Sequence, residues 1–180
     1  MEESASRNNI IILPTSLDFD DEKLQFLSID ADRLSVKYIG PDDYKVAAMT
    51  LANNPIPQEC EVFYFEVKII DKGENGMIGV GFCTKQSLKT IRSNTESDDS
   101  NIILMPGQEK NSWSYHGDDG YSFSSKSGEL YGPPYTTDDI IGCYLNYRNK
   151  IIFYTKNGVS LGPACFLPND LNDTLSNILQ

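Results

Sequence analysis

Closely spaced turn signals in residues 113–162 constrain the fold of this chain more than any other feature. A Gly-Asp-Asp-Gly turn occupies 117–120, an Arg-Asn pair follows at 148–149, and Asn157-Gly158 closes the series. Each turn lies between short runs rich in Ile, Tyr or Phe, which pack well on a pleated sheet. Asn-Gly is the strongest of these signals, because a type I′ hairpin turn needs positive φ at both central residues. The stretch therefore predicts successive antiparallel hairpins, and a sheet whose loops serve recognition.

Two further runs predict strands upstream of this stretch. Residues 62–71 (VFYFEVKIID) alternate with period two, so that Phe63, Phe65 and Val67 share one apolar face. Residues 77–83 (MIGVGFC) place Gly79 and Gly81 together on one face. Glycines that alternate in a strand usually let another backbone or a large ring approach closely.

The remaining segments are less regular. Residues 1–16 read as a flexible leader, and short strands are expected at 24–29, 33–39 and 45–51, with another at 159–166. Residues 85–112 are polar and show no periodicity, which predicts a long loop that is functional or disordered. Apolar residues at 171, 175, 178 and 179 follow helical spacing behind Asn169 and Asp170, so a short amphipathic helix is expected in 168–180.

Length and charge narrow the possible classes of protein. The 180 residues suffice for one well-buried core, and the net charge of −11 disfavours a nucleic-acid partner. No apolar run approaches the roughly 20 residues of a membrane span. The start MEESASRNN lacks the features of a secretory signal, so a cytoplasmic or nuclear location is expected, or a secreted one if a signal peptide was removed. The four cysteines have no CxxC spacing and are expected to be reduced thiols, with one or two disulfides as the alternative.

The residues needed for catalysis are sparse, and we predict no enzyme, no cofactor and no metal site. His116 is the single histidine and precedes a turn, where a structural role is expected. Gly79-x-Gly81 lacks the third glycine of a dinucleotide fingerprint, and there is no Walker A motif. The acidic pairs at 118–119 and 138–139 are read as turn residues, with a calcium site or a glycosidase dyad as the alternatives.

Six motifs occur in a fixed order: YFEV at 64–67, GVG at 79–81, YHGDDG at 115–120, YGP at 131–133, DIIGC at 139–143 and FYTKNG at 153–158. In order and spacing they resemble a SPRY domain. The nearest subgroup is the RanBPM type, the scaffold subunit of the CTLH/GID ubiquitin ligases. The match covers about residues 13–167 and includes NPIP at 54–57 and Leu161-Gly162.

The resemblance implies an all-β fold, a sandwich of two antiparallel sheets without catalytic activity. It also implies binding of a partner peptide or domain through loops at one end, here 40–45 and 86–112. We expect Tyr44 to be an aromatic anchor, Lys45 to pair with an acidic ligand, and Leu104 and Met105 to make apolar contacts. The alternatives are that Tyr44 packs on the sheet rim and that Met105 fills a gap in the core.

The chain departs from the subgroup in three places. Residues 86–105 are longer than the subgroup's loop, and Gln108 stands where the subgroup usually has Trp. The family continues into further strands where this chain has its helix-like tail. The resulting division is a leader (1–16), a SPRY domain (17–167) and a divergent or truncated tail (168–180). An unpaired edge left by the missing strands would be covered by the tail or by a second copy in a homodimer.

The leading hypothesis for function is an adaptor that binds another protein and does no chemistry. One alternative is an effector-like mimic of a scaffold that acts by competition. Another is a carbohydrate-binding sandwich that uses the acidic turns. The LisH and CTLH segments of ligase scaffolds are missing, so a ubiquitin-ligase role is not inferred.

Overall fold

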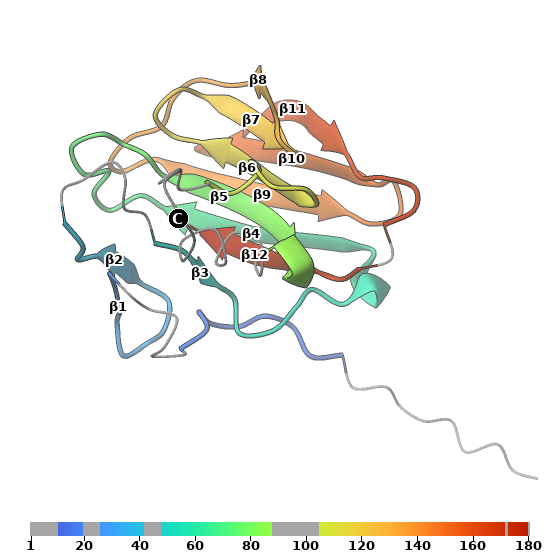
Figure 1. Ribbon diagram of the computed structural model, residues 1–180, viewed down its shortest axis with the longest axis horizontal. Helices are drawn as coiled ribbons and strands as arrows, with labels where there is room; N and C mark the ends of the chain where they lie inside the picture. Colours follow the sequence, from blue (N-terminus) through green and yellow to red (C-terminus); the bar gives the residue numbers. More distant parts are fainter. Residues whose placement is uncertain (1–10, 20–25, 42–47, 88–104, 172, 180) are drawn as a thin grey trace, which may run out of the picture.

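The computed structural model describes residues 11–19, 26–41, 48–87, 105–171 and 173–179, and their regular structure is almost entirely strand (Figure 1). A 3-10 helix, η2, spans Gln58–Cys60. The strands are β1 (Leu27–Ile29), β2 (Val36–Tyr38), β3 (Thr50–Leu51), β4 (Val62–Lys68), β5 (Gly79–Thr84), β6 (Ser112–His116), β7 (Tyr121–Ser124), β8 (Ser127–Leu130), β9 (Ile140–Asn146), β10 (Ile151–Lys156), β11 (Val159–Phe166) and β12 (Leu175–Leu179).

The strands form two stacked antiparallel sheets and a small hairpin (Figure 1). One sheet has the order β11-β10-β9-β4 and the other β3-β12-β5-β6-β7-β8, while β1 pairs only with β2. The predicted all-β sandwich is therefore confirmed. All three turn signals join antiparallel neighbours, namely β6 to β7, β9 to β10 and β10 to β11. Within the described ranges, no helix is long and apolar enough to cross a membrane.

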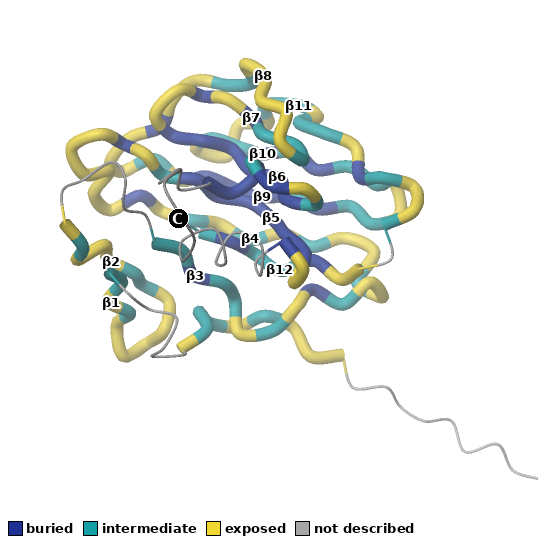
Figure 2. Tube along the Cα trace, viewed as in Figure 1, coloured by how far each residue is buried: buried dark blue, intermediate teal, exposed yellow. Residues whose placement is uncertain are grey.

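The core lies between the two sheets and is built from their alternating inward residues (Figure 2). Ile141, Cys143 and Leu145 of β9 are fully buried, as is Phe82 of β5. The rings of Phe65 and Phe82 meet edge to face across the sandwich, with centroids 5.6 Å apart. The apolar face predicted for residues 62–68 thus packs on the core.

Tyrosine hydroxyls bring hydrogen bonds into one end of this core. The Tyr135 hydroxyl lies 2.8 Å from the Ile78 carbonyl oxygen, to which it donates. The Tyr131 hydroxyl donates to the Gly162 carbonyl oxygen at 2.6 Å and accepts the Tyr154 backbone N–H at 3.0 Å. The Tyr154 hydroxyl itself is buried and finds no hydrogen-bond partner among the described residues.

The two strand glycines behave as the sequence predicts. A Cβ at Gly81 would lie 2.0 Å from the carbonyl oxygen of Trp113 on the neighbouring strand β6. A Cβ at Gly79 would lie 3.3 Å from Pro106 and 3.4 Å from the His116 ring. Glycine at position 81 therefore leaves room for the backbone of β6, and glycine at position 79 leaves room for Pro106 and the His116 ring.

The prediction of a C-terminal helix is wrong, because residues 175–179 form strand β12 between β3 and β5. Leu175 faces the main core, whereas Ile178 lies on the opposite face with Cys83 and is covered by Met49 and Leu51. Both faces of the strand are covered, so its apolar residues do not alternate and their spacing imitates a helix. The tail pairs with β5 from Leu175↔Thr84 to Leu179↔Val80, so this edge is paired within the chain and gives no reason to expect a homodimer there.

The unpaired Tyr154 hydroxyl leads to a stability prediction. Tyr154→Phe should leave the free energy of unfolding unchanged or raise it, because the substitution removes a buried hydroxyl that has no partner. Tyr131→Phe is the matched control and should cost about 1–3 kcal/mol, because two backbone groups lose their partner. Urea unfolding measures both variants, and an equal loss in the two would contradict the prediction.

Candidate functional site

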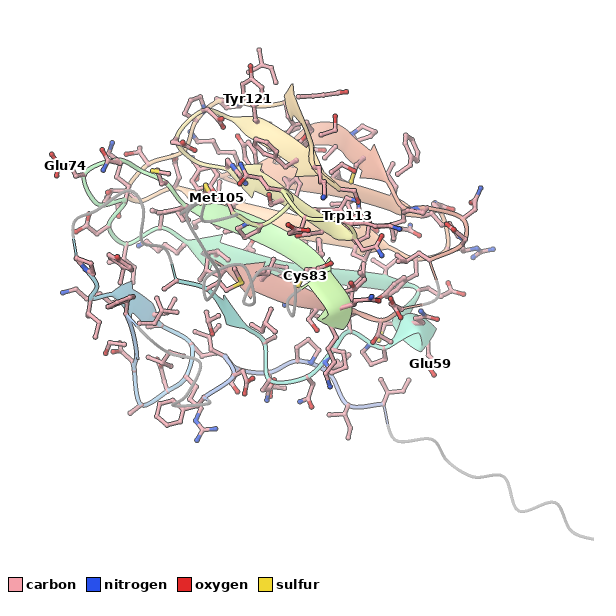
Figure 3. All side chains as sticks on the ribbon, viewed as in Figure 1. Glu59, Glu74, Cys83, Met105, Trp113 and Tyr121 are labelled. Carbon is pink, nitrogen blue, oxygen red and sulfur yellow. The ribbon has the colours of Figure 1, made fainter. Side chains whose placement is uncertain are left out.

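The partner-binding residues are expected on two loops, 40–45 and 86–112. Tyr44, Lys45 and Leu104 are outside the described residues, so their roles stay predictions. Met105 lies beside β5 with its side chain 6% exposed (Figure 3). Its backbone N–H donates to Gln108 Oε1 at 2.9 Å. Gln108, which departs from the subgroup pattern, thus stabilises the turn that follows Met105.

The segment 105–111 covers the outward face of the six-stranded sheet. Trp113 and Tyr115 of β6 point into the core, so Ser112, Ser114 and His116 point outward. These polar side chains are nevertheless buried, because segment 105–111 lies over them. The alternating polar residues of SWSYH (112–116) therefore form hydrogen bonds to a segment that covers them and are not exposed to water.

Hydrogen bonds fix this covering segment at successive residues. The Pro106 carbonyl oxygen accepts from His116 Nε2 at 2.8 Å and also from the Ser114 hydroxyl. The Gly107 N–H donates to Ser112 Oγ at 2.7 Å, and its carbonyl oxygen accepts from the Lys126 N–H at 2.9 Å. Strand β6 and the β7–β8 turn thus hold the C-terminal end of the long loop, where the chain comes back to the sheet.

The other end of the loop is held at the same place. Ser87 is 4% exposed, and its hydroxyl lies 3.0 Å from Thr84 Oγ1 and 2.9 Å from the Asn111 carbonyl oxygen. The Thr84 N–H donates to that same carbonyl oxygen at 3.0 Å. The sheet therefore fixes both ends of the segment that contains Leu104.

The flank of the first loop is also fixed. The Tyr38 hydroxyl donates to the Pro41 carbonyl oxygen at 2.9 Å, and the Tyr38 ring lies over Gly40, where a Cβ would come within 2.4 Å of it. The β1–β2 hairpin joins the larger sheet through residues 17–18: the Leu17 N–H donates to Arg33 and the Asp18 N–H donates to Leu51. Ile39, next to this flank, is 61% exposed.

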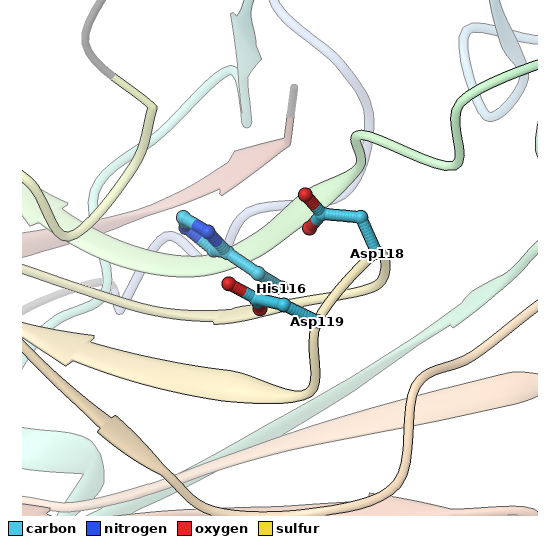
Figure 4. Close-up of side chains that lie close together, drawn as sticks. All are labelled: His116, Asp118 and Asp119. Atoms are coloured by element: carbon cyan, nitrogen blue, oxygen red, sulfur yellow. The ribbon is translucent and has the colours of Figure 1, made fainter.

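The turn after β6 brings its histidine and two aspartates together (Figure 4). His116 is 2% exposed and stacks on Phe123, with ring centroids 4.3 Å apart. Burial lowers the pKa of His116, and it outweighs the opposite effects of the Pro106 carbonyl and of the Asp118 and Asp119 carboxylates. The imidazole ring is thus packed between β7 and the covering segment 105–111.

The second acidic pair has a structural explanation. Asp139 accepts hydrogen bonds from Lys156 at 3.0 Å, from Asn157 Nδ2 at 2.8 Å and from the Thr136 N–H at 2.8 Å. Burial acts to raise the pKa of Asp139, but these hydrogen bonds prevail and lower it. The carboxylate therefore ties β9 to the β10–β11 hairpin.

The two stacked antiparallel sheets place the chain in the class of antiparallel β-sandwich domains. The family model of the SPRY domain matches residues 62–172. The chain belongs to the SPRY domain family, and the predicted resemblance is confirmed. Membership in this family supports a protein-interaction role for the chain.

The relatives show the same membership. The chain is 41% identical over 157 residues to Ran-binding protein 10 of Danio rerio and 41% identical to Ran-binding protein 9 of Homo sapiens, each over 86% of its length. It is 38% identical over 165 residues to the Ran-binding protein M homolog of Arabidopsis thaliana. The chain spans 24%, 20% and 32% of these three relatives. A crystal structure of a human SPRY domain superposes with a TM-score of 0.62 at 25% identity, covering 86% of this chain and 88% of that one.

A substitution at Gly107 tests how closely segment 105–111 packs on the sheet. Its φ is +85°, and an added Cβ would lie 2.5 Å from Phe123 Cβ and from Ser114 Oγ. Gly107→Ala should therefore combine left-handed backbone strain of about 1–2 kcal/mol with a steric clash. Gly73→Ala is the matched control, because Gly73 has φ +67° and no atom within 4 Å of the added Cβ. Thermal or urea unfolding should show the larger loss for Gly107→Ala, and equal losses would contradict the packing described.

The lowered pKa of Asp139 leads us to expect that the free energy of unfolding depends on pH. Its pKa is lower in the folded chain than in the unfolded chain, so its contribution is present above the unfolded pKa and is lost as the pH falls through the folded value. Asp139→Asn should therefore lower stability at pH 7 and flatten the acid limb of the stability profile below about pH 4. Urea unfolding from pH 7 to pH 3 measures this, with Asp71→Asn as a control. An acid limb of unchanged slope would refute the assignment.

Proposed function

We propose that this chain is a non-catalytic module that binds a partner peptide or partner domain through the loops 40–45 and 86–112. The observation that carries the proposal is the fixed base of the longer loop. Ser87 and Asn111 close its ends, and Pro106 and Gly107 are bonded to β6. Fixing both ends of a loop limits the conformations open to the chain between them, which reduces the entropy lost on binding.

The proposed contacts keep the roles that the sequence suggests. Tyr44 is an aromatic anchor, Leu104 is an apolar contact, and Lys45 is a cation for an acidic group on the partner. Met105 is 6% exposed, so we assign it a supporting place at the edge of the contact. In a chain of net charge −11, a lysine at the contact would also lessen the repulsion of an acidic partner.

A reducing compartment, cytoplasm or nucleus, fits this role. None of the four cysteines forms a disulfide, and Cys83 and Cys143 are buried. Burial raises the pKa of the Cys143 thiol well above its usual range, so this side chain is an inert part of the core.

Partner capture followed by loop substitution tests the proposal. Affinity capture with the wild-type chain identifies a partner, whose Kd is then measured for each variant. Tyr44→Ala combined with Leu104→Ala should weaken binding at least about tenfold, because anchors of this kind carry most of the energy of an interface.

The control is Leu130→Ala, which changes a residue that is 74% exposed on the edge strand β8. It should leave Kd unchanged, and both variants should keep the wild-type melting temperature. Wild-type affinity in the Tyr44/Leu104 double variant would overturn the proposed contact surface.

A further inference from the structure

We propose that His116, Asp118 and Asp119 form a binding site for a divalent transition-metal cation of the zinc type. One ligand atom from each residue lies within 4.8 Å of the other two (Figure 4). The three residues belong to one tight turn, in which the Gly120 N–H donates to the His116 carbonyl oxygen at 3.2 Å. The turn itself is held by the Gly117 N–H, which donates to the Ile78 carbonyl oxygen at 2.8 Å.

The protonation of His116 follows from its surroundings. Nε2 faces the Pro106 carbonyl oxygen at 2.8 Å, and a carbonyl only accepts, so the proton of the neutral ring is on Nε2. Nδ1 then presents a lone pair. Within the described part of the chain, no hydrogen bond reaches Nδ1, although the residue is 2% exposed. A ring held in one orientation by this hydrogen bond keeps the Nδ1 lone pair available for a ligand.

The neighbouring groups cannot satisfy that lone pair, because both carboxylates are also acceptors. Asp119 Oδ1 accepts the Tyr121 N–H at 2.9 Å, which leaves its second oxygen available. Asp118 is exposed and makes no hydrogen bond or ion pair with any described residue. Three acceptors thus face one another without a donor. A cation relieves this directly.

The ligand set selects the kind of metal. Imidazole nitrogen favours zinc and similar ions, whereas calcium and magnesium prefer oxygen ligands alone. Zinc binds nitrogen and carboxylate oxygen at about 2.0–2.2 Å, so its ligand atoms are about 3.4 Å apart. The exposed carboxylates need to move by about 1 Å to reach this spacing, which side-chain rotation supplies, while stacking on Phe123 holds the imidazole. Three protein ligands leave a coordination position for water.

The single histidine makes the test specific. The chain is labelled with ¹⁵N-histidine, and its imidazole spectrum is recorded at pH 7 during titration with ZnCl₂, with CaCl₂ and MgCl₂ in parallel. We expect an unprotonated Nδ1 without metal, a shift of that resonance by tens of ppm with zinc, and no shift with calcium or magnesium. The melting temperature should rise with zinc.

Variants decide whether the aspartates bind the metal. Asp118→Asn should weaken zinc binding at least about tenfold, measured by calorimetry, because it removes a charged ligand without disturbing any described contact. Asp138→Asn is the control, since Asp138 is a turn aspartate whose side chain is 83% exposed. A protonated Nδ1 in the metal-free chain, an unchanged Nδ1 resonance at 1 mM zinc, or equal zinc affinity in the two variants would each overturn the proposal.

Discussion

The Pro106 carbonyl oxygen, which accepts from both His116 and Ser114, joins the long loop to the centre of the larger sheet. Strand β6 has its aromatic residues in the core and its polar residues beneath segment 105–111, so it is buried on both faces. Loss of the covering segment would leave the outward serines and histidine without their backbone partners. The rigidity of the sheet and the placement of the loop therefore depend on the same few hydrogen bonds. Segment 105–111 thus keeps its position through hydrogen bonds to the sheet.

Sequence periodicity predicts this fold well where one face of a strand is dry. The alternation in 62–68 and the turns at 117–120, 148–149 and 157–158 correspond to observed strands and hairpins. Periodicity fails at residues 175–179, because Leu175 and Ile178 are buried on opposite faces and the alternation is lost. It also gives no warning that Ser112 and Ser114 are buried, since alternating serines look the same whether water or another segment covers them. The two acidic pairs are equally alike in sequence, and only the structure separates the bonded Asp139 from the unpaired Asp118.

The tyrosines show how a sandwich of this kind admits polar groups into its interior. Tyr115 and Tyr135 each direct a hydroxyl to a backbone carbonyl of a connecting segment, and Tyr131 directs its hydroxyl to a carbonyl of β11. Burial raises the pKa of Tyr131 to about 12, so its hydroxyl remains protonated and can donate at any physiological pH. The bonds to Pro133 and Ile78 fix connecting segments that strand pairing does not reach. Tyrosine is suited to this position because its ring packs in the core while its hydroxyl reaches the rim.

Because β12 lies between β3 and β5, the six-stranded sheet can be completed only late in the synthesis of the chain. Residues 175–179 leave the ribosome after every other strand of their sheet, yet β3 joins that sheet only through them. Until they emerge, the nascent chain exposes one whole backbone edge of β5, whose residues are all buried in the finished domain. Such an edge can pair with the wrong strand or with another nascent chain. The β5 edge therefore stays open to such pairing until residues 175–179 are available.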